Sequence, residues 1–334
     1  MLTINANNLE ALSLGATILG SGGGGHPKIL YDLIAYLMET HGEARIISID
    51  DLLENDLVVP LAMVGAPLVC MEKIPNTTLL DAIYTHIKRD FPHRRIVLMP
   101  AEIGGCNALT PLLLALKYDL PILDADLIGR AFPKLDMCKP AVLGRSCHPT
   151  YVSDLMGNSV SLHLTGLGML EPLIRDITIR FGSSSSIATY LFEGKEAHDY
   201  VIENSVSRAL SLGEKLLLHH ALEATVIGSG IVSDVYHDMK GGFLLGHATI
   251  KSKASCFKVH YQNEYLKVSQ NDRDIDGSPN IIALIEKKSG LPLTTEALKY
   301  GQQVQILSLK APDFWMTPKA HSVVDYKLLN LESI

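Results

Sequence analysis

Apolar and polar residues alternate along the first half of the chain in two recurring patterns. Apolar residues three or four positions apart predict helices over 8–19, 27–39, 77–89 and 107–117. Short apolar runs separate these segments and predict strands over 45–49, 57–64, 95–99 and 121–124. Such strands between amphipathic helices are typical of a sheet covered on both faces. We therefore expect residues 1–165 to form a layered α/β domain with a mostly parallel sheet.

The pattern changes after about residue 165. Two further helices are predicted over 169–181 and 205–219, and a run of serines at 183–186 between them could cap a helix end. From residue 224 onward, short strand patterns follow one another, separated by turns rich in Gly, Asp, Asn and Pro. This spacing is typical of a β-sandwich or a barrel. The expected fold is α/β + β, with residues 166–334 forming a mainly-β domain that begins with two helices.

Composition and charge exclude several classes of protein. Hydrophobic residues make up 47% of the 334 residues and charged residues 19%, which allows large buried cores and argues against disorder. The formal net charge is −7, and Lys and Arg form no blocks, so nucleic-acid binding is not expected. The most apolar stretch, 57–71, is shorter than the roughly 18 residues that a membrane span requires and contains two prolines. No membrane association is expected.

The cysteines and the first residues indicate the compartment. The five cysteines form no CxxC pair, and their odd number does not suit a disulfide scaffold or a structural zinc site. No Lys or Arg precedes Lys28, so the basic start of a secretory signal is missing. We therefore expect a reduced, cytoplasmic protein, and the apolar composition favours a homo-oligomer.

The first candidate for chemistry is the glycine-rich sequence GSGGGGHP at 20–27, between two predicted helices. Backbone amides at the start of the second helix could bind a phosphate, a carboxylate or another negative oxygen. The segment lacks the GxxxxGK[ST] frame of a phosphate-binding loop and does not follow a strand. The alternatives are a flexible turn between helices and, for the histidine, a capping role. The candidate binding residues here are Gly22, Gly23, Gly24, Gly25 and His26.

The second candidate is PAEIGGCNALTP at 100–111, directly after a predicted strand. The carboxyl ends of strands in an open α/β sheet are where ligands bind. Glu102 could act as a general base, and Asn107 could cap the following helix or contact a substrate. Cys106 could be a nucleophile at the start of that helix, and a small packing residue is the alternative.

The third candidate is LDADLIGRAFP at 123–133, at the end of the next predicted strand. Asp124 and Asp126 are two residues apart, so in an extended chain they project to the same face and could form a general base or hold a cation. Arg130 lies four residues after Asp126, and an ion pair across a helical turn is the alternative to substrate binding. Because this turn and the Glu102 turn end successive strands, we expect them at one edge of the sheet.

No metal or cofactor follows from the sequence. His26, Glu102, Asp124 and Asp126 could together offer an oxygen-rich cation site, but their spacing matches no metal-binding motif. We predict no metal site, and the sequence leaves any cofactor unknown.

Five segments, taken in order, resemble one known family: GSGGGGHP, PAEIGGCN, LDADLIGRAFP, SRALSLG at 207–213 and YQNEYL at 261–266. Along nearly its whole length the chain is similar to the S-methyl-thiohydantoin desulfurase-like family. Members of this family occur alone or joined to hydantoinase/oxoprolinase chains. The resemblance implies an α/β domain followed by a mainly-β domain. It also implies chemistry on a hydantoin-like ring, a cyclic ureide or thioureide that water opens or desulfurises.

Together these observations predict a hydrolase that cleaves a carbon–nitrogen or carbon–sulfur bond of a small hydantoin-type ring. Glu102 or Asp124 would activate water, and the amides of the glycine turn would stabilise a substrate oxygen. Asp126 and Arg130 would orient the ring. Covalent catalysis by Cys106 is the sharper alternative.

Two other functions fit the same residues. The chain could be a non-catalytic binding or regulatory subunit of a hydantoinase/oxoprolinase-type protein, as the joined arrangement in the family implies. It could also be a nucleotide-dependent enzyme that holds phosphate at the glycine turn, although the missing Lys-Ser/Thr frame argues against this. As a hydrolase its partner would be a small-molecule substrate, and as a subunit its partner would be a hydantoinase-type chain.

Overall fold

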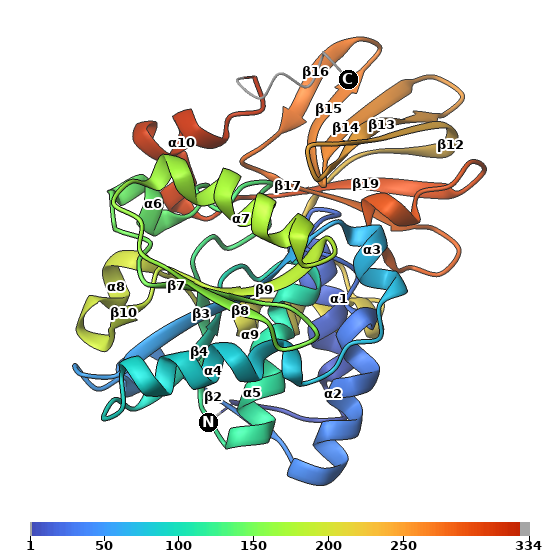
Figure 1. Ribbon diagram of the computed structural model, residues 1–334. Helices are drawn as coiled ribbons and strands as arrows, with labels where there is room; N and C mark the ends of the chain where they lie inside the picture. The colour runs from blue at the N-terminus through green and yellow to red at the C-terminus, as the bar shows by residue number, and fades with distance from the viewer. Residues whose placement is uncertain (1, 328–334) are drawn as a thin grey trace.

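The computed structural model describes residues 2–327, which form two large sheets with helices packed mainly around the first (Figure 1). The first sheet has nine described strands in the order β1-β2-β5-β4-β3-β9-β7-β8, with β10 also paired to β3. Strands β2, β5, β4 and β3 are parallel, and the strands on either side are antiparallel. The strands span Leu2–Ile4 (β1), Ala44–Ile47 (β2), Leu57–Gly65 (β3), Ile96–Pro100 (β4), Ile122–Leu123 (β5), Thr150–Ser153 (β7), Ser159–Leu162 (β8), Ser184–Ala188 (β9) and Phe192–Glu193 (β10).

Helices cover both faces of this sheet because alternate residues of its strands point to opposite sides. Leu57, Val59 and Leu61 of β3 belong to one buried cluster with α1, α2, α4, α5 and α9. Val58 and Val64 belong to a second cluster with α6, α7, α8 and α10. The helices span Leu9–Leu19 (α1), Lys28–His41 (α2), Pro67–Glu72 (α3), Thr78–Asp90 (α4), Thr110–Tyr118 (α5), Lys139–Leu143 (α6), Leu170–Arg180 (α7), Ala197–Tyr200 (α8), Ser205–Leu217 (α9) and Pro318–Val324 (α10).

The second sheet is antiparallel throughout, in the order β16-β15-β14-β13-β12-β19-β17-β18. The long strand β12 pairs with β19 along its first part and with β13 along its second part. The strands span Thr225–Lys240 (β12), Phe243–Lys251 (β13), Cys256–Gln262 (β14), Glu264–Gln270 (β15), Arg273–Gly277 (β16), Ile281–Glu286 (β17), Pro292–Leu293 (β18) and Gln303–Leu309 (β19). The predicted fold class, α/β + β, is therefore confirmed.

After residue 166 the chain returns to the first sheet before it builds the second. β9 lies between β3 and β7, and α9 packs on α1. The two helices that we expected at the start of the mainly-β domain thus pack on the α/β layers, and the second sheet begins at Thr225. The serine run is a strand rather than a helix cap, with Ser184, Ser185 and Ser186 buried in β9.

Helices α1 and α9 cross closely because each has a glycine at the contact. A Cβ atom on Gly15 would lie 1.7 Å from the carbonyl oxygen of Ala209, and one on Gly213 would lie 1.7 Å from that of Ala11. Ala209 and Gly213 are four residues apart, on one face of α9, within the segment SRALSLG. This packing accounts for the small residues in that segment.

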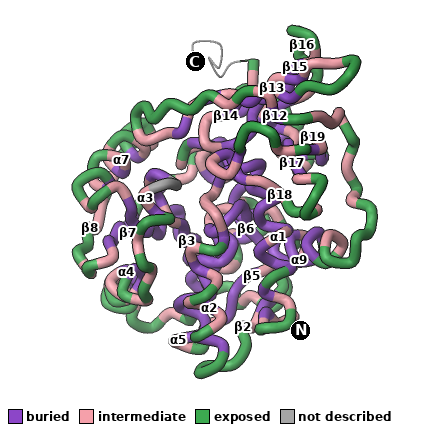
Figure 2. Tube along the Cα trace, turned by 90° about the vertical axis from the view of Figure 1, so that its right-hand side faces the viewer, coloured by how far each residue is buried: buried purple, intermediate pink, exposed green. Residues whose placement is uncertain are grey.

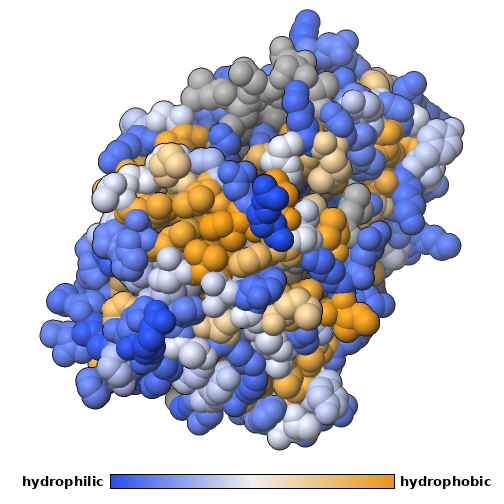
Figure 3. All heavy atoms as spheres, viewed as in Figure 1, coloured by the Kyte–Doolittle hydropathy of each residue, from blue (hydrophilic) through white to orange (hydrophobic). Residues whose placement is uncertain are grey.

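Burial and surface follow the layers. Figure 2 shows buried residues concentrated along the interior strands and on α1 and α9, with exposed residues on the outer loops. On the face seen in Figure 3, an area of apolar surface lies among hydrophilic side chains. Within residues 2–327, no helix combines the length and the apolar character needed to cross a membrane.

Candidate active site

A cavity of about 110 Å³ lies where the ends of β3 and β4 meet the glycine-rich turn and the β14–β15 turn of the second sheet. This volume is several times the roughly 10–15 Å³ that one water molecule requires, so the cavity can hold several waters or a small ligand. Glu102 and Asn107 line it from the first sheet, and Asn263 and Glu264 line it from the second. Both halves of the chain therefore build the cavity.

Glu102 follows β4 and is held by Asn107. The Asn107 Nδ2 atom donates to Glu102 Oε1 at 2.5 Å, and Asn107 Oδ1 accepts the backbone N–H of Met63 at 2.7 Å, which fixes the amide. Burial, together with the nearby charge of Asp126, raises the pKa of Glu102 to about 7. A carboxyl group with this pKa exchanges a proton near neutral pH, as a general base requires. Asn107 thus positions Glu102 and does not cap α5, which begins at Thr110.

Arg130 is fully buried between the two halves of the chain. Its Nη1 atom donates to the carbonyl oxygens of Pro279 at 2.9 Å and Asn280 at 2.5 Å, and Nε donates to that of Ala131 at 2.8 Å. The guanidinium carbon lies 4.4 Å from the ring centroid of Phe132, which lines the cavity. Burial lowers the pKa of Arg130 to about 10, so the group remains positive at neutral pH.

Glu264 is a cavity residue that was not among the candidate site residues from the sequence. It begins β15 and is 3% exposed. Among the residues that the structure describes, none makes a hydrogen bond with its Oε2 atom. Burial and the charge of Glu102 raise the pKa of Glu264 well above its usual value. In the sequence the only signal is a polar QNE cluster inside the apolar strand pattern YQNEYL, where a buried acid is unexpected.

The glycine turn is required mainly by close packing. Gly24 and Gly25 line the cavity. A Cβ on Gly22 would lie 2.4 Å from the ring of Tyr265, and a Cβ on Gly23 would lie 2.1 Å from Glu264 Oε1. The turn is therefore pressed against the second sheet, which does not suit the alternative of a flexible link between helices.

The two glycine-bearing turns also pack directly on each other. The carbonyl oxygens of Gly24 and Gly25 each accept the backbone N–H of Cys106 at 3.0 Å. Gly24 and Gly105 have positive φ angles of 73° and 57°, and a Cβ on Gly105 would lie 2.3 Å from the carbonyl oxygen of Gly25. Glycine is needed at both positions for the turns to approach this closely.

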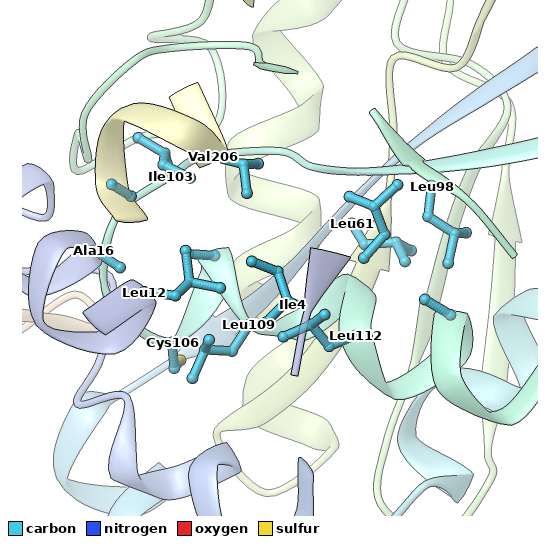
Figure 4. Packing of buried hydrophobic residues seen from close by; sticks show 14 of the residues in the cluster. Ile4, Leu12, Ala16, Leu61, Leu98, Ile103, Cys106, Leu109, Leu112 and Val206 are labelled. Carbon is cyan, nitrogen blue, oxygen red and sulfur yellow. The ribbon is translucent and has the colours of Figure 1, made fainter. Parts of the chain in front are cut away.

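Cys106 lines the cavity but is also embedded in the first cluster. Figure 4 shows Cys106 within the same cluster of buried side chains as Leu12 and Leu109. The Sγ atom donates to the carbonyl oxygen of Gly24 at 3.1 Å, and burial raises the pKa of the thiol well above its usual value. Since the thiolate is the nucleophilic form, this environment favours the packing role over covalent catalysis.

The two aspartates of the third candidate segment point away from the cavity. Asp124 Oδ1 accepts the backbone N–H of Ser207 at 2.9 Å and so caps the start of α9. Asp126 accepts the N–H of Ile103 at 2.9 Å and that of Gly129 at 2.8 Å. Among the described residues that line the cavity, neither aspartate occurs. The two turns lie at one edge, as expected, but these two carboxyl groups hold backbone.

Asp126 differs from the prediction in two further ways. Its oxygens accept backbone N–H groups, whereas the guanidinium of Arg130 donates to carbonyl oxygens, so the ion pair that was the alternative to substrate binding does not form. Burial raises the pKa of Asp126 to about 7 even though these N–H groups oppose the change. Because Ile103 follows Glu102, the Asp126 carboxyl positions the Glu102 turn and has no contact with the cavity of its own.

The side chain of His26 contacts the backbone at the start of the next helix. The His26 Nδ1 atom accepts the backbone N–H of Lys28 at 3.2 Å, at the start of α2. His26 therefore has the capping role that was the alternative for it. Across residues 2–327, no three His, Cys, Asp or Glu side chains are placed so that they could hold a metal ion.

Comparison with known proteins identifies the family of the chain. Residues 7–163 match the family model described as "S-Me-THD-like, N-terminal domain", and residues 167–332 match "S-Me-THD-like, C-terminal domain". A comparison with curated proteins finds no match. A crystal structure of a protein from Chromobacterium violaceum aligns over 99% of this chain and 97% of that one, with a TM-score of 0.84 and 19% identity, which shows a shared fold. Because the two models together span nearly the whole sequence, the chain belongs to the S-Me-THD-like family.

Proposed function

We propose that this protein is a hydrolase that acts on a small cyclic ureide or thioureide of the hydantoin type, with Glu102 as the general base. The observation that carries the proposal is the lined cavity. A carboxyl group with a pKa of about 7, fixed by Asn107, faces a space large enough for a small molecule. The family name, which refers to S-methyl-thiohydantoin chemistry, supplies the class of ring.

The reaction is addition of water followed by loss of a leaving group. Glu102 takes a proton from water as the oxygen bonds to the ring carbon that carries sulfur. The C–S bond then breaks as the added oxygen becomes the carbonyl oxygen; one proton of the water goes to the ring nitrogen and the other leaves with methanethiol. For a ring without sulfur the same addition occurs at a carbonyl carbon, and the C–N bond breaks. Arg130 contributes fixed positive charge at the junction, which favours the negative intermediate over a long range.

Glu102 suits this role better than the other candidates. Asp124 is occupied by the start of α9, and Asp126 is occupied by two backbone N–H groups. The Cys106 thiol is held neutral by its buried position. Water activated by Glu102 therefore requires no rearrangement, whereas either alternative requires existing hydrogen bonds to break or a thiol to ionise in an apolar cluster.

The direct test is turnover in ¹⁸O-labelled water. The purified chain is incubated with S-methyl-thiohydantoin and with hydantoin, and products are followed by mass spectrometry together with methanethiol release. We expect one labelled oxygen in the product, retained activity in Cys106→Ser, and no covalent adduct on the protein. An adduct that disappears in Cys106→Ser would replace the general-base mechanism with the nucleophilic one.

The same assay separates the subunit alternative. Ring binding without turnover by the purified chain, followed by turnover when a hydantoinase/oxoprolinase-type protein is added, would contradict a self-contained hydrolase. Turnover by the chain alone would exclude a purely regulatory role.

A further inference from the structure

We propose that Glu264 is the specificity-determining residue of the cavity, and that its carboxyl group binds the N–H and C=O edge of a cyclic amide. The inference rests on the proposed function and adds the residue that selects a ring over an open-chain amide. Glu264 lines the cavity from the second sheet, whereas Glu102 lines it from the first. The two acids thus come from opposite halves of the chain.

The position of Glu264 is fixed by the tight turn between β14 and β15. Asn263 has a positive φ of 60°, its Oδ1 atom accepts the N–H of Leu244 at 2.9 Å, and its carbonyl oxygen accepts the Thr295 hydroxyl at 2.8 Å. On the other side, the N–H of Tyr265 donates to the carbonyl oxygen of Ser21 at 2.6 Å. Contacts on both sides hold the carboxyl group in place, as selective binding requires.

One oxygen of the Glu264 carboxyl group has no hydrogen-bond partner among the described residues. It packs against the backbone of Gly23, where a Cβ would lie 2.1 Å from Oε1. The Oε2 atom is buried, and within residues 2–327 no group makes a hydrogen bond with it. An unsatisfied buried oxygen is costly, so a ligand that supplies the missing partner gains binding energy there.

The chemistry of a neutral carboxyl group defines that ligand. Burial and the charge of Glu102 shift the pKa of Glu264 upward, against the opposing charge of Arg130, and so favour the protonated form of its carboxyl group. It then has an O–H donor beside a C=O acceptor. A ring amide is forced to be cis, so its N–H and C=O lie side by side and match this pair. An open-chain amide is trans, and its N–H and C=O point in opposite directions.

The first experiment compares three ligands of similar polarity by isothermal titration calorimetry on the full chain. Hydantoin has ring N–H groups, 1,3-dimethylhydantoin has none, and N-acetylglycine N-methylamide offers trans secondary amides only. We expect hydantoin to bind more tightly than either other ligand by roughly tenfold to a hundredfold. Equal affinity for hydantoin and its dimethyl analogue would overturn the assignment.

The second experiment uses variants of Glu264 that keep or remove the donor and acceptor. Glu264→Gln retains an N–H beside a C=O, and we expect hydantoin affinity to stay within about threefold of the wild type. Glu264→Leu removes both groups, and we expect the preference for hydantoin over the dimethyl analogue to disappear. The preference ratio is measured because a general loss of packing would weaken both ligands alike. A preserved ratio in Glu264→Leu, or its loss in Glu264→Gln, contradicts the proposal.

Glu296→Gln is the matched control. Glu296 is a half-buried acid of the second half of the chain, and its buried Oε1 atom likewise has no hydrogen-bond partner in the described structure. It is not among the described residues that line the cavity, so its variant is expected to keep the wild-type ratio.

The outcomes also separate this inference from the proposed function. If hydantoin is bound with the expected preference but is not turned over, the hydrolase proposal fails and the role of Glu264 stands. If hydantoin is hydrolysed and the dimethyl analogue binds equally well, only the role of Glu264 fails.

Discussion

The turn after β4 and the turn after β5 look alike in the sequence, but their carboxyl groups have different roles in the structure. Each follows a parallel strand, each contains carboxyl groups, and both lie at the same edge of the sheet. Glu102 in the first turn is held by one side-chain amide and faces the cavity. Asp124 and Asp126 in the second turn accept backbone N–H groups from α9 and from the neighbouring loops.

The difference teaches that the partners of a carboxyl group, rather than its place at a strand end, decide whether it is available for chemistry. A carboxylate that accepts several backbone N–H groups is committed to holding the chain. One that has few partners and faces a cavity can transfer a proton to or from a ligand. Substitutions in the turn after β4 should therefore lower activity, and substitutions in the turn after β5 should lower stability.

The largest effect is expected for Glu102→Gln. The amide cannot accept a proton from water, so kcat on the ring substrate should fall by about 10²–10⁴-fold, the usual contribution of a general base. The free energy of unfolding should change little or rise, because an ionisable group in a buried site is replaced by a neutral one. Steady-state kinetics and urea unfolding measure the two quantities, and unchanged kcat would transfer the role of base to another group.

Asp126→Asn should show the opposite profile. Losing an acceptor for the N–H groups of Ile103 and Gly129 should lower the free energy of unfolding by about 2–3 kcal/mol. Any loss of activity should follow the displaced Glu102 turn and be rescued in part by lower temperature. Urea unfolding measures the first quantity. Full stability with abolished turnover at all temperatures would place Asp126 in the chemistry.

Activity and the free energy of unfolding should change in opposite directions as pH rises. A base with a pKa of about 7 gives a kcat/KM that falls about tenfold for each pH unit below that value. Because the folded state holds this proton more tightly than the unfolded chain, the free energy of unfolding falls as pH rises from about 4.5 to about 7. In Glu102→Gln this slope should become smaller and persist, since Asp126 titrates in the same direction. An unchanged slope would contradict the assignment.

The smallest effect is expected for Asp124→Asn. Its side chain caps α9 from outside the helix, and a weaker cap costs about 0.5–1 kcal/mol. Turnover in the ring-hydrolysis assay should remain roughly within twofold of the wild type, because Asp124 does not line the cavity. A loss comparable to that of Glu102→Gln would remove the distinction between the two turns.

The elements of the first half were predictable because local periodicity determines them. The spacing of apolar residues placed α2 and β3 within two residues of their observed ends. The serine strand β9 was missed because small hydroxyl side chains give no apolar signal. It is buried nonetheless, since the Ser185 hydroxyl pairs with that of Thr178 at 2.7 Å. Pairing with β3 and β7, rather than apolar side chains, accounts for the burial of β9.

The site was predictable only in its first-half part. Glu102 and Asn107 follow a strand, and that local context marks them. Glu264 lies 162 positions after Glu102 in the sequence, and it reaches the cavity only because Tyr265 hydrogen-bonds Ser21 in the glycine turn. The sequence suggested that the glycines supply backbone amides to a ligand. The close approach of Tyr265 and Glu264 explains better why glycine is required at these positions. Neither relation exists until the two sheets have been brought together.

The return of the chain to the first sheet after residue 166 has a consequence for how the molecule can be divided. The family models separate at 163–167, yet β9 lies between β3 and β7, and α9 crosses α1. A gene cut at that junction would produce two fragments, each lacking surfaces that the other covers. We expect neither to be a folded module in isolation and the pair to regain ring hydrolysis when co-expressed. Evolution is therefore expected to exchange the two sequence halves together rather than shuffle them as separate units.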